Sequence, residues 1–125
     1  MVDKSAKDVE IVPHEGFLEA RFLGAFSVDR FKAQVEFAVG ACTERGILLL
    51  LLDYTRLSPV PGTLERYEIS THGAEAARGL SKLAGLATKE QIGEKFGAMV
   101  ARNRGLNVDV FTDRQEAVRW LLATP

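Results

Sequence analysis

The sequence has little cysteine, no excess charge of either sign and no long hydrophobic run, and each shortage excludes a class of protein. Its single cysteine, Cys42, excludes an intrachain disulfide and a cysteine-rich metal site. The 16 Lys and Arg residues nearly balance the 17 Asp and Glu residues, so the chain lacks the basic excess that binds nucleic acid. A content of 46% hydrophobic and 26% charged residues excludes a disordered or collagen-like chain.

The hydrophobic runs are too short to cross a membrane. The longest aliphatic run covers residues 47–52, whereas a spanning helix needs about 20 apolar residues. The first ten residues are polar and lack the apolar core of a signal peptide. We therefore expect a cytoplasmic protein without a transmembrane segment.

The length of 125 residues fits one domain, which buries about two-thirds of the surface of its unfolded chain. The polar start predicts a flexible leader over residues 1–8, followed by one domain over residues 9–125. No composition shift within that range indicates a second domain.

Five segments are typical of strands. Residues 9–13 and 17–23 flank a turn at Gly16 and predict an antiparallel hairpin. The leucine run at 47–52 is apolar on both faces, which is typical of a central parallel strand covered by helices. Shorter strands are predicted within residues 79–87 and over residues 106–111.

The first predicted helix has clear boundaries. Ser27 provides an N-cap oxygen, and Gly46 stands where a left-handed residue ends a helix. The helical spacing predicts one buried stripe and places Lys32, Gln34, Glu36 and Thr43 off it. The stripe comprises Phe31, Val35, Ala38, Val39 and Cys42.

Three further helices follow. A helix over residues 63–78 begins near Thr63 as its N-cap and is expected to bury Leu64, Tyr67, Ile69 and Ala74. Capping boxes predict helix starts at Thr88 and Thr112. The buried stripes expected there are Ile92, Phe96, Met99 and Val100, and then Ala117, Val118, Trp120 and Leu121.

The resulting order, β-β-α-β-α-β-α-β-α, predicts an α/β fold with a single open sheet. The sheet should be mostly parallel, with an antiparallel strand at its N-terminal edge and helices packed on it. Small domains with exposed sheet edges often pair, which leaves a homodimer open.

Open sheets of this kind bind ligands outside the carboxyl ends of their strands. Helix N-termini that begin near such ends direct N–H groups and positive partial charge toward an anion. We therefore expect a candidate ligand or partner surface at this end of the sheet. It comprises Asp53, Tyr54, Thr55, Arg56, Thr63, Lys89, Thr112 and Asp113.

No motif in the sequence predicts catalysis. Nucleophile elbow, Walker, dinucleotide-binding and His-Glu-x-x-His patterns are all absent, and no cofactor or metal is expected. Asp53 and Asp113 follow predicted strands, where carboxylates can serve as general bases, but Asp also satisfies loop and helix N–H groups. The capping interpretation is favoured over the enzymatic one.

Two segments carry a family resemblance. The tail has Arg-Asn-Arg-Gly at 102–105, Val-Phe-Thr-Asp at 110–113, Glu-Ala at 116–117 and Trp-Leu at 120–121. With the middle segment at residues 48–69, it resembles the SpoIIAA-like family of bacterial STAS-fold proteins. The resemblance implies a fold related to anti-sigma-factor antagonists, to the STAS domains of anion transporters and to CRAL-TRIO lipid-binding domains.

The resemblance also bears on a phosphorylation switch. Antagonists of this family present a phosphorylated Ser in an Asp-Ser-Ser-Gly turn that opens the helix after the central strand. This chain has Pro-Gly-Thr-Leu at residues 61–64, so Thr63 is the only hydroxyl at that place. The acidic residue and the following glycine are absent.

Three functions follow as hypotheses. The first is a non-enzymatic regulatory or small-ligand-binding module, whose lipid or anionic ligand would place an apolar body between helix and sheet. The second is a protein-interaction domain of the antagonist kind that lacks the usual phosphorylated serine. The third is an enzyme that uses Asp53 or Asp113.

Overall fold

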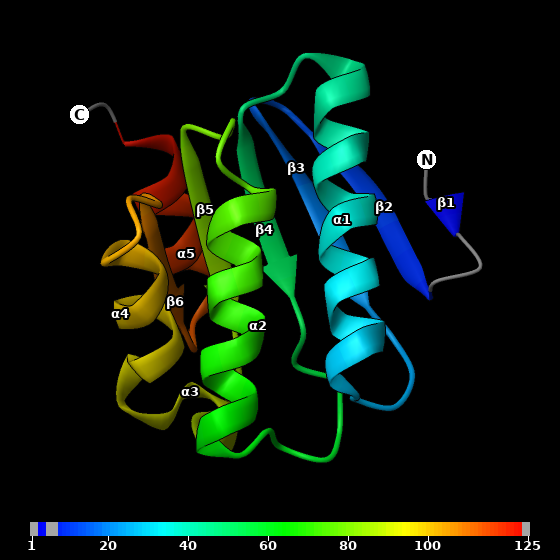
Figure 1. Cartoon of the computed structure of the whole chain (residues 1–125). Coiled ribbons are helices and arrows are strands. Elements are labelled where there is room, and N and C mark those ends of the chain that lie inside the picture. Colours follow the sequence, from blue (N-terminus) through cyan, green and yellow to red (C-terminus); the bar gives the residue numbers. More distant parts are fainter. Residues whose placement is uncertain (1–2, 5–7, 124–125) are drawn as a thin grey trace.

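One sheet organises the fold, and its strands lie side by side in chain order (Figure 1). The computed structural model describes residues 3–4 and 8–123. Within these residues the sheet has six strands. They are β1 (Asp3–Lys4), β2 (Val9–His14), β3 (Phe17–Phe22), β4 (Leu49–Asp53), β5 (Lys82–Leu86) and β6 (Val108–Phe111). The first three pair antiparallel, and β3 to β6 pair parallel.

The helices cover the two faces of the sheet unequally. They are α1 (Val28–Arg45), α2 (Thr63–Ala76), α3 (Lys89–Ile92), the 3-10 turn η1 (Gly93–Lys95), α4 (Phe96–Arg102) and α5 (Arg114–Leu122). Each crossover from β3 to β6 moves one strand further in the same direction. Because such crossovers are right-handed, α1, α2 and α4 lie on one face of the sheet. Helix α5, which follows the last strand, packs on the other face (Figure 1).

This architecture confirms the predicted α/β fold, with β1 as an additional strand. Asp3 pairs with Ile11 and Lys4 with Glu10, so part of the predicted leader joins the edge of the sheet. Residues 1–2 and 5–7 of that leader lie outside the described residues. The predicted hairpin is confirmed, and β2 and β3 pair from Val9 with Phe22 to His14 with Phe17.

The leucine run forms the centre of the sheet, as predicted. Leu50 and Leu52 belong to the core beneath α1 and α2, whereas Leu51 belongs to the core beneath α5. All three are buried, because successive strand residues point to opposite faces. Burial on both faces therefore explains why this strand has no polar alternation.

Helix α1 has the predicted boundaries. The Ser27 hydroxyl accepts a hydrogen bond from Arg30 N at 3.1 Å, and Gly46 adopts the left-handed conformation that ends the helix. Phe31, Val35, Ala38 and Cys42 are buried as expected, and Val39 is partly buried.

Gln34 corrects the predicted polar face of α1, because its exposed fraction is 0%. Its amide donates to the carbonyls of Asp8 and Leu23 at 3.2 and 3.1 Å. These contacts satisfy backbone groups where the chain enters β2 and leaves β3. Helical spacing alone could not show that this polar side chain has partners inside the fold.

The predicted buried face of α2 is wrong at two positions. Leu64 is 84% exposed and Tyr67 is 45% exposed, whereas Ala74 is buried. The face that points inward instead begins at Arg66 and continues through Ile69. It was missed because Arg66 is charged and the apolar residues of α2 do not gather on one side.

Two predicted helix caps are also wrong by one position. Gly62, not Thr63, is the N-cap of α2, and the Glu65 carboxylate accepts from Gly62 N at 2.9 Å. At α5 the cap is Asp113, not Thr112, and its carboxylate accepts from Glu116 N at 3.1 Å.

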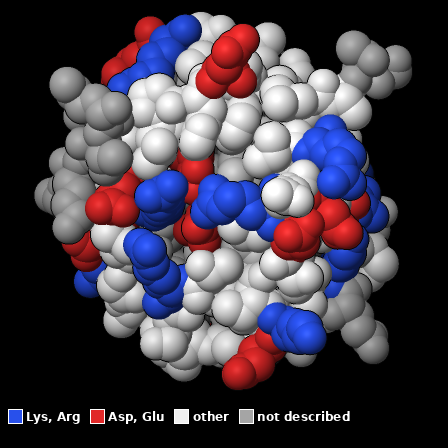
Figure 2. All heavy atoms as spheres, turned by 180° about the vertical axis from the view of Figure 1, so that it is seen from behind, with Lys and Arg blue, Asp and Glu red and all other residues white. Residues whose placement is uncertain are grey.

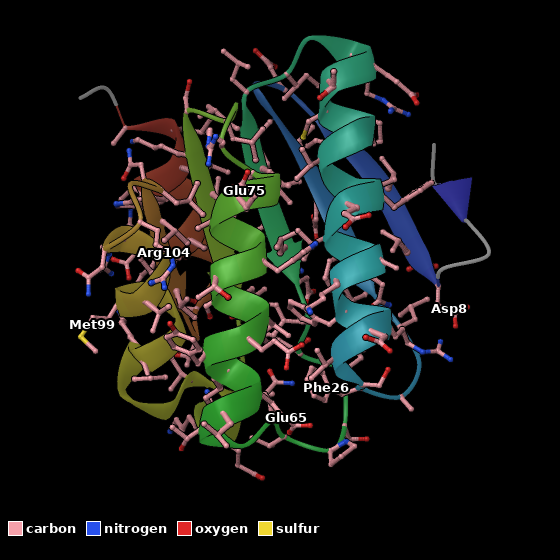
Figure 3. The ribbon with its side chains drawn as sticks, in the orientation of Figure 1. Asp8, Phe26, Glu65, Glu75, Met99 and Arg104 are labelled. Atoms are coloured by element: carbon pink, nitrogen blue, oxygen red, sulfur yellow. The ribbon has the colours of Figure 1, made fainter. Side chains whose placement is uncertain are left out.

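The helix predicted from Thr88 is interrupted. The Thr88–Gln91 capping box forms as expected, but Gly93 and Lys95 adopt positive φ angles of 45° and 62°. The backbone therefore turns through η1 before α4 begins. Met99, expected to be buried, is 49% exposed and points away from the body of the molecule (Figure 3).

Candidate ligand cavity

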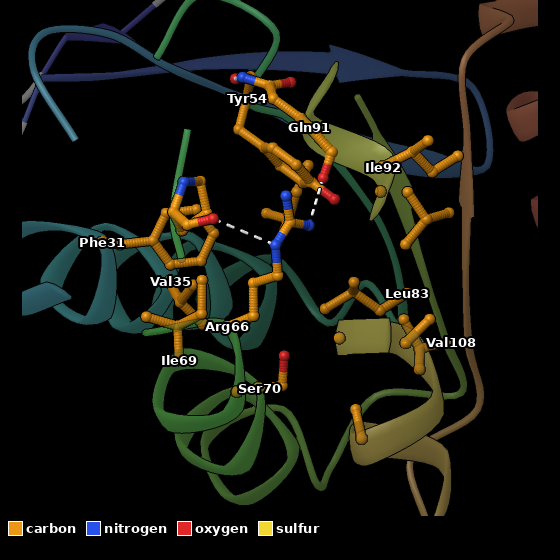
Figure 4. A pocket seen from close by; sticks show the side chains of 18 of the residues that line it. Phe31, Val35, Tyr54, Arg66, Ile69, Ser70, Leu83, Gln91, Ile92 and Val108 are labelled. Carbon is orange, nitrogen blue, oxygen red and sulfur yellow. Dashed lines mark hydrogen bonds between the residues drawn. The ribbon is translucent and has the colours of Figure 1, made fainter. Parts of the chain in front are cut away.

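A cavity of about 120 Å³ lies between the sheet and the pair of helices α2 and α4. Its lining is mostly apolar and comes from β4, β5, β6, α1, α2 and α4 (Figure 4). Leu52, Leu83 and Val108 line it from the sheet, while Ile69 and Ala98 line it from the helices. Polar side chains lie at the end of the cavity nearest the carboxyl termini of the strands.

Tyr54 lines this polar end directly after strand β4. Its ring packs edge-on to Phe31 at a centroid distance of 5.8 Å. Burial raises the pKa of the Tyr54 hydroxyl to about 12, even though the nearby Arg66 guanidinium acts in the opposite direction. Tyr54 therefore stays protonated at neutral pH. Its hydroxyl has no hydrogen-bond partner among the described residues.

Arg66 extends from α2 into the same end of the cavity (Figure 4). Its Nε donates to the carbonyl of Pro61 at 3.2 Å, and its Nη1 donates to the carbonyl of Gln91. Within the described part of the chain, no carboxylate forms an ion pair with it. A partly buried guanidinium is thus held by backbone carbonyls alone, which leaves its positive charge uncompensated.

Gln91 holds the polar end together. Its side-chain amide donates to the carbonyls of Tyr54 and Leu57 at 2.8 and 3.1 Å, and its side-chain oxygen accepts from Thr88 N. It joins the loop after β4 to helix α3. Because Arg66 bonds both this loop and Gln91, the two segments that close the cavity are fixed relative to each other.

Three glycines provide space for the polar side chains of the cavity. A Cβ added at Gly85 would lie 2.8 Å from the Tyr54 hydroxyl, and one at Gly97 would lie 2.8 Å from the Ser70 hydroxyl. A Cβ at Gly93 would lie 2.8 Å from Arg66 Nη1. Real Cβ atoms essentially never approach so closely. Gly93 and Gly97 thus let η1 and α4 pack closely against α2.

The predicted surface residues do not form one site. Tyr54 faces the cavity, whereas Asp53 points to the opposite face of the sheet, where it bonds Arg114 at 2.9 Å. Asp53 also accepts from the backbone N and the hydroxyl of Thr55 at 3.0 and 2.7 Å. Asp113 caps α5. Both carboxylates thus serve the local structure, in agreement with the capping interpretation.

The other predicted residues lie exposed around the same end of the fold. Thr63 and Lys89 are the first residues of α2 and α3, and Thr112 immediately precedes the α5 cap. Arg56 reaches Glu10 at 4.0 Å. None of these four has a side chain that lines the cavity.

Behind the sheet, charged side chains of both signs lie across the middle of the molecular surface (Figure 2). Glu19 also belongs to the back of the sheet, where it bonds Arg114 of α5, but its exposed fraction is 0%. Its carboxylate contacts His14 Nε2 at 2.7 Å, Arg21 Nε at 2.9 Å and Arg114 Nη1 at 2.8 Å. Burial alone would raise the pKa of Glu19, but these hydrogen bonds from Arg21, Arg114 and His14 hold it below its usual value.

Comparison with solved structures shows the same architecture at low sequence identity. An anti-sigma factor antagonist from Mycobacterium paratuberculosis has a TM-score of 0.64 at 12% identity, with 97% of this chain and 100% of that chain covered. An uncharacterised DUF3478 protein with a SpoIIAA-like fold, from Shewanella loihica PV-4, has a TM-score of 0.58 at 13% identity. That match covers 90% of this chain and 91% of the other. This chain has a SpoIIAA-like fold.

The comparison confirms the resemblance at the level of fold. The sequence matches no family model and no curated protein.

Among the residues that the structure describes, no helix is long and apolar enough to cross a bilayer. In the same residues, no three His, Cys, Asp or Glu side chains come together as metal ligands would.

Sequence reasoning identified Tyr54 but missed Arg66 and Ser70, two polar residues of α2 that this SpoIIAA-like fold places in its cavity. Arg66, Ile69, Ser70, Gly73 and Ala74 follow helical i, i+3, i+4, i+7 and i+8 spacing, and all five line the cavity. That spacing was the available signal. It is easily overlooked, because two of its members are polar and one is glycine.

Proposed function

We propose that this protein is a non-enzymatic regulatory module that binds a small amphipathic ligand in the cavity between α2, α4 and the sheet. The observation that carries the proposal is the cavity itself, of about 120 Å³. Apolar side chains line its body, and Tyr54, Arg66 and Gln91 converge at one end. Sites for small molecules typically combine an apolar lining with a few convergent polar groups.

The size of the cavity limits the ligand. An engineered cavity of about 150 Å³ binds benzene. The apolar body of a ligand enclosed here would therefore have about five or six carbon atoms. A long lipid chain would require the helices to separate.

The test is to fill the cavity without disturbing the fold. Gly73 lies within α2 and lines the cavity, and a Cβ added there would have no neighbour within 4 Å. Gly73→Leu should therefore occupy the space. Replacing a helical glycine also removes an unfavourable backbone entropy of about 0.5–1 kcal/mol, so the variant should fold at least as well as the wild type.

Binding can be measured with benzene as an apolar probe. We expect benzene to shift backbone amide resonances of cavity residues in the wild type and to leave those of Gly73→Leu unchanged. Gly40→Leu is the matched control, because Gly40 is a helical glycine of α1 that also has no neighbour within 4 Å and does not line the cavity. Native mass spectrometry of the purified protein would reveal a ligand that copurifies. Failure of the wild type to bind benzene would refute the proposal.

A second function is favoured by exposed apolar residues at the start of α2. Leu64 is 84% exposed and Val60 is 39% exposed, on either side of Thr63. Because one structural neighbour is an anti-sigma factor antagonist, we propose as the alternative that this surface docks an anti-sigma factor. Ligand binding in the cavity would require neither this docking surface nor a homodimer.

An anti-sigma factor from the same organism would be titrated against the wild type and three variants. Leu64→Ser should weaken binding at least about tenfold, because a fully desolvated leucine contributes about 1.5–3 kcal/mol. Met99→Ser, at an exposed apolar residue of α4, should leave binding unchanged. Thr63→Asp should also leave it unchanged if Thr63 is not a phosphorylation switch. Equal binding by Leu64→Ser and wild type would exclude this surface.

A further inference from the structure

Resting on the proposed function, we infer that the ligand is a short-chain carboxylate whose charged end binds Arg66 and the Tyr54 hydroxyl. The inference begins with the hydrogen-bonding capacity that the cavity leaves unused. A guanidinium has five N–H groups and no acceptor. Two hydrogen bonds to the Pro61 and Gln91 carbonyls account for only part of the Arg66 donors.

The neighbouring hydroxyls add further donors. Neither Tyr54 nor Ser70 uses its hydroxyl in a hydrogen bond to another described residue, and both side chains line the cavity. Burial raises the pKa of Tyr54 to about 12, so its hydroxyl stays protonated at physiological pH and can donate a hydrogen bond. The Pro61 and Gln91 carbonyls already accept from Arg66. The free capacity at the polar end is therefore mainly that of donors.

A donor-rich, positively charged end selects an anionic acceptor. An ionised carboxylate only accepts hydrogen bonds, and its two oxygens match the planar N–H groups of arginine. It would also supply the negative charge that no described carboxylate provides to Arg66. A neutral alcohol would meet the same donors without compensating that charge.

The glycines indicate that this arrangement depends on close packing. Gly93 leaves room for the Arg66 guanidinium, and Gly85 leaves room for the Tyr54 hydroxyl. Side chains at either position would displace these donors from the cavity. The polar end thus has a defined shape, set by β5 and η1 as well as by the residues that carry the donors.

The size of the cavity and the charge of its polar end together define the probe. Hexanoate has a carboxylate and an apolar chain of five carbon atoms, which agrees with about 120 Å³ of space. The neutral analogue 1-hexanol has nearly the same shape. We expect hexanoate to bind the wild type about 10- to 100-fold more tightly, because hydrogen bonds to charged groups contribute more than neutral ones.

Variants of Arg66 separate the charge from the cavity. Arg66→Gln should weaken hexanoate binding about 10- to 100-fold but 1-hexanol binding much less, because the Gln amide can still donate to a neutral hydroxyl. Retained 1-hexanol binding would show that the cavity is intact. Arg66→Lys keeps the charge but loses the planar fork, so its affinity for hexanoate should be intermediate. Arg104→Gln is the control, since Arg104 bonds the exposed Tyr67 at 2.9 Å outside the cavity. Both affinities should be unchanged in that variant.

The outcomes distinguish this inference from the proposed function. If hexanoate and 1-hexanol bind the wild type equally, or if Arg66→Gln weakens both to the same extent, the carboxylate inference is wrong and the ligand-binding function stands. If neither compound shifts cavity resonances in the wild type, both proposals fail. Loss of hexanoate binding in Arg104→Gln would show that overall charge, not Arg66, attracts the ligand.

Discussion

The buried carboxylate of Glu19 offers a test of what holds β2, β3 and α5 together. Glu19→Gln keeps the shape of the side chain but removes its charge. The amide would also direct N–H donors toward Arg21 and Arg114, which are themselves only donors. Both arginines would then lose the carboxylate to which they now bond at 2.9 and 2.8 Å.

The expected loss of stability follows from how deeply Glu19, Arg21 and Arg114 are buried. Removing one member of a fully buried ion pair costs about 3–5 kcal/mol. Here Glu19 is fully buried, but the side chains of Arg21 and Arg114 are 32% and 43% exposed, so water can solvate them again. We therefore expect Glu19→Gln to lower the free energy of unfolding by about 2–3 kcal/mol. With a urea m-value in the range usual for small proteins, this loss of stability lowers the urea concentration at the unfolding midpoint by roughly 1–2 M.

The pH dependence provides an independent signature. Because the pKa of Glu19 is lowered in the folded state, the unfolded chain binds more protons in acid. The stabilisation by Glu19 is thus complete above its usual pKa of 4.5 and is lost as the pH falls through the lower pKa of the folded state. Glu19→Gln should show a smaller loss of stability than the wild type between pH 7 and pH 3.5. Asp109, whose pKa is also lowered, contributes with the same sign in both proteins.

Urea unfolding followed by far-ultraviolet circular dichroism at pH 7 and at pH 3.5 would measure both effects. Glu15→Gln is the matched control, because Glu15 is an exposed carboxylate in the same hairpin and is expected to change stability by less than about 0.5 kcal/mol. A midpoint for Glu19→Gln equal to that of the wild type, with the same pH dependence, would refute the reasoning. It would mean that the buried carboxylate contributes nothing beyond its shape.

Three further predictions concern individual side chains. Burial raises the pKa of Cys42 to about 11. A thiol reagent at pH 8 should therefore label Cys42 at least about 100-fold faster in denaturant than in the native protein. Rapid labelling of the native protein would place Cys42 at the surface. Trp120 is only partly buried, against Phe111 and Lys82. Trp120→Ala should therefore lower the free energy of unfolding, measured with urea, by about 2 kcal/mol. Truncation of a fully buried aromatic side chain costs about 3–5 kcal/mol. Because the Glu65 carboxylate accepts from the Gly62 N–H, Glu65→Ala should lower the free energy of unfolding by about 1 kcal/mol. Thr63→Ala should lower it by less than about 0.5 kcal/mol. The reverse order would identify Thr63 as the cap.

Most of the fold could be predicted because its signals are local. The leucine run at β4, the Ser27 cap and the Gly46 stop each depend on residues close together in the chain. Strands that alternate with helices then restrict the topology, because right-handed crossovers leave few arrangements of a parallel sheet. The antiparallel hairpin followed from the turn at Gly16 and its flanking strands.

Local signals failed where a side chain has its partner in another element. Gln34 reads as a surface residue of α1, yet it bonds backbone carbonyls at Asp8 and Leu23. Glu19 reads as a polar residue of a half-exposed strand, yet Arg114, 95 positions later, helps to bury its charge. Asp8 lies 26 positions from Gln34, and Arg114 lies 95 positions from Glu19, so only packing decides whether each polar group lies inside or outside.

The candidate site shows the same division. The sequence indicated that a site would lie at the carboxyl end of the sheet and that Tyr54 would be there, because the carboxyl ends of parallel strands meet at one edge. The sequence alone could not show that Arg66 points inward beside Tyr54, since that contact requires α2 to pack against α4 and η1. It requires in addition that Gly85 and Gly93 leave space for the two polar groups. Chain order and local patterning thus determined the sheet and its helices, while tertiary packing alone decided which polar side chains the cavity contains.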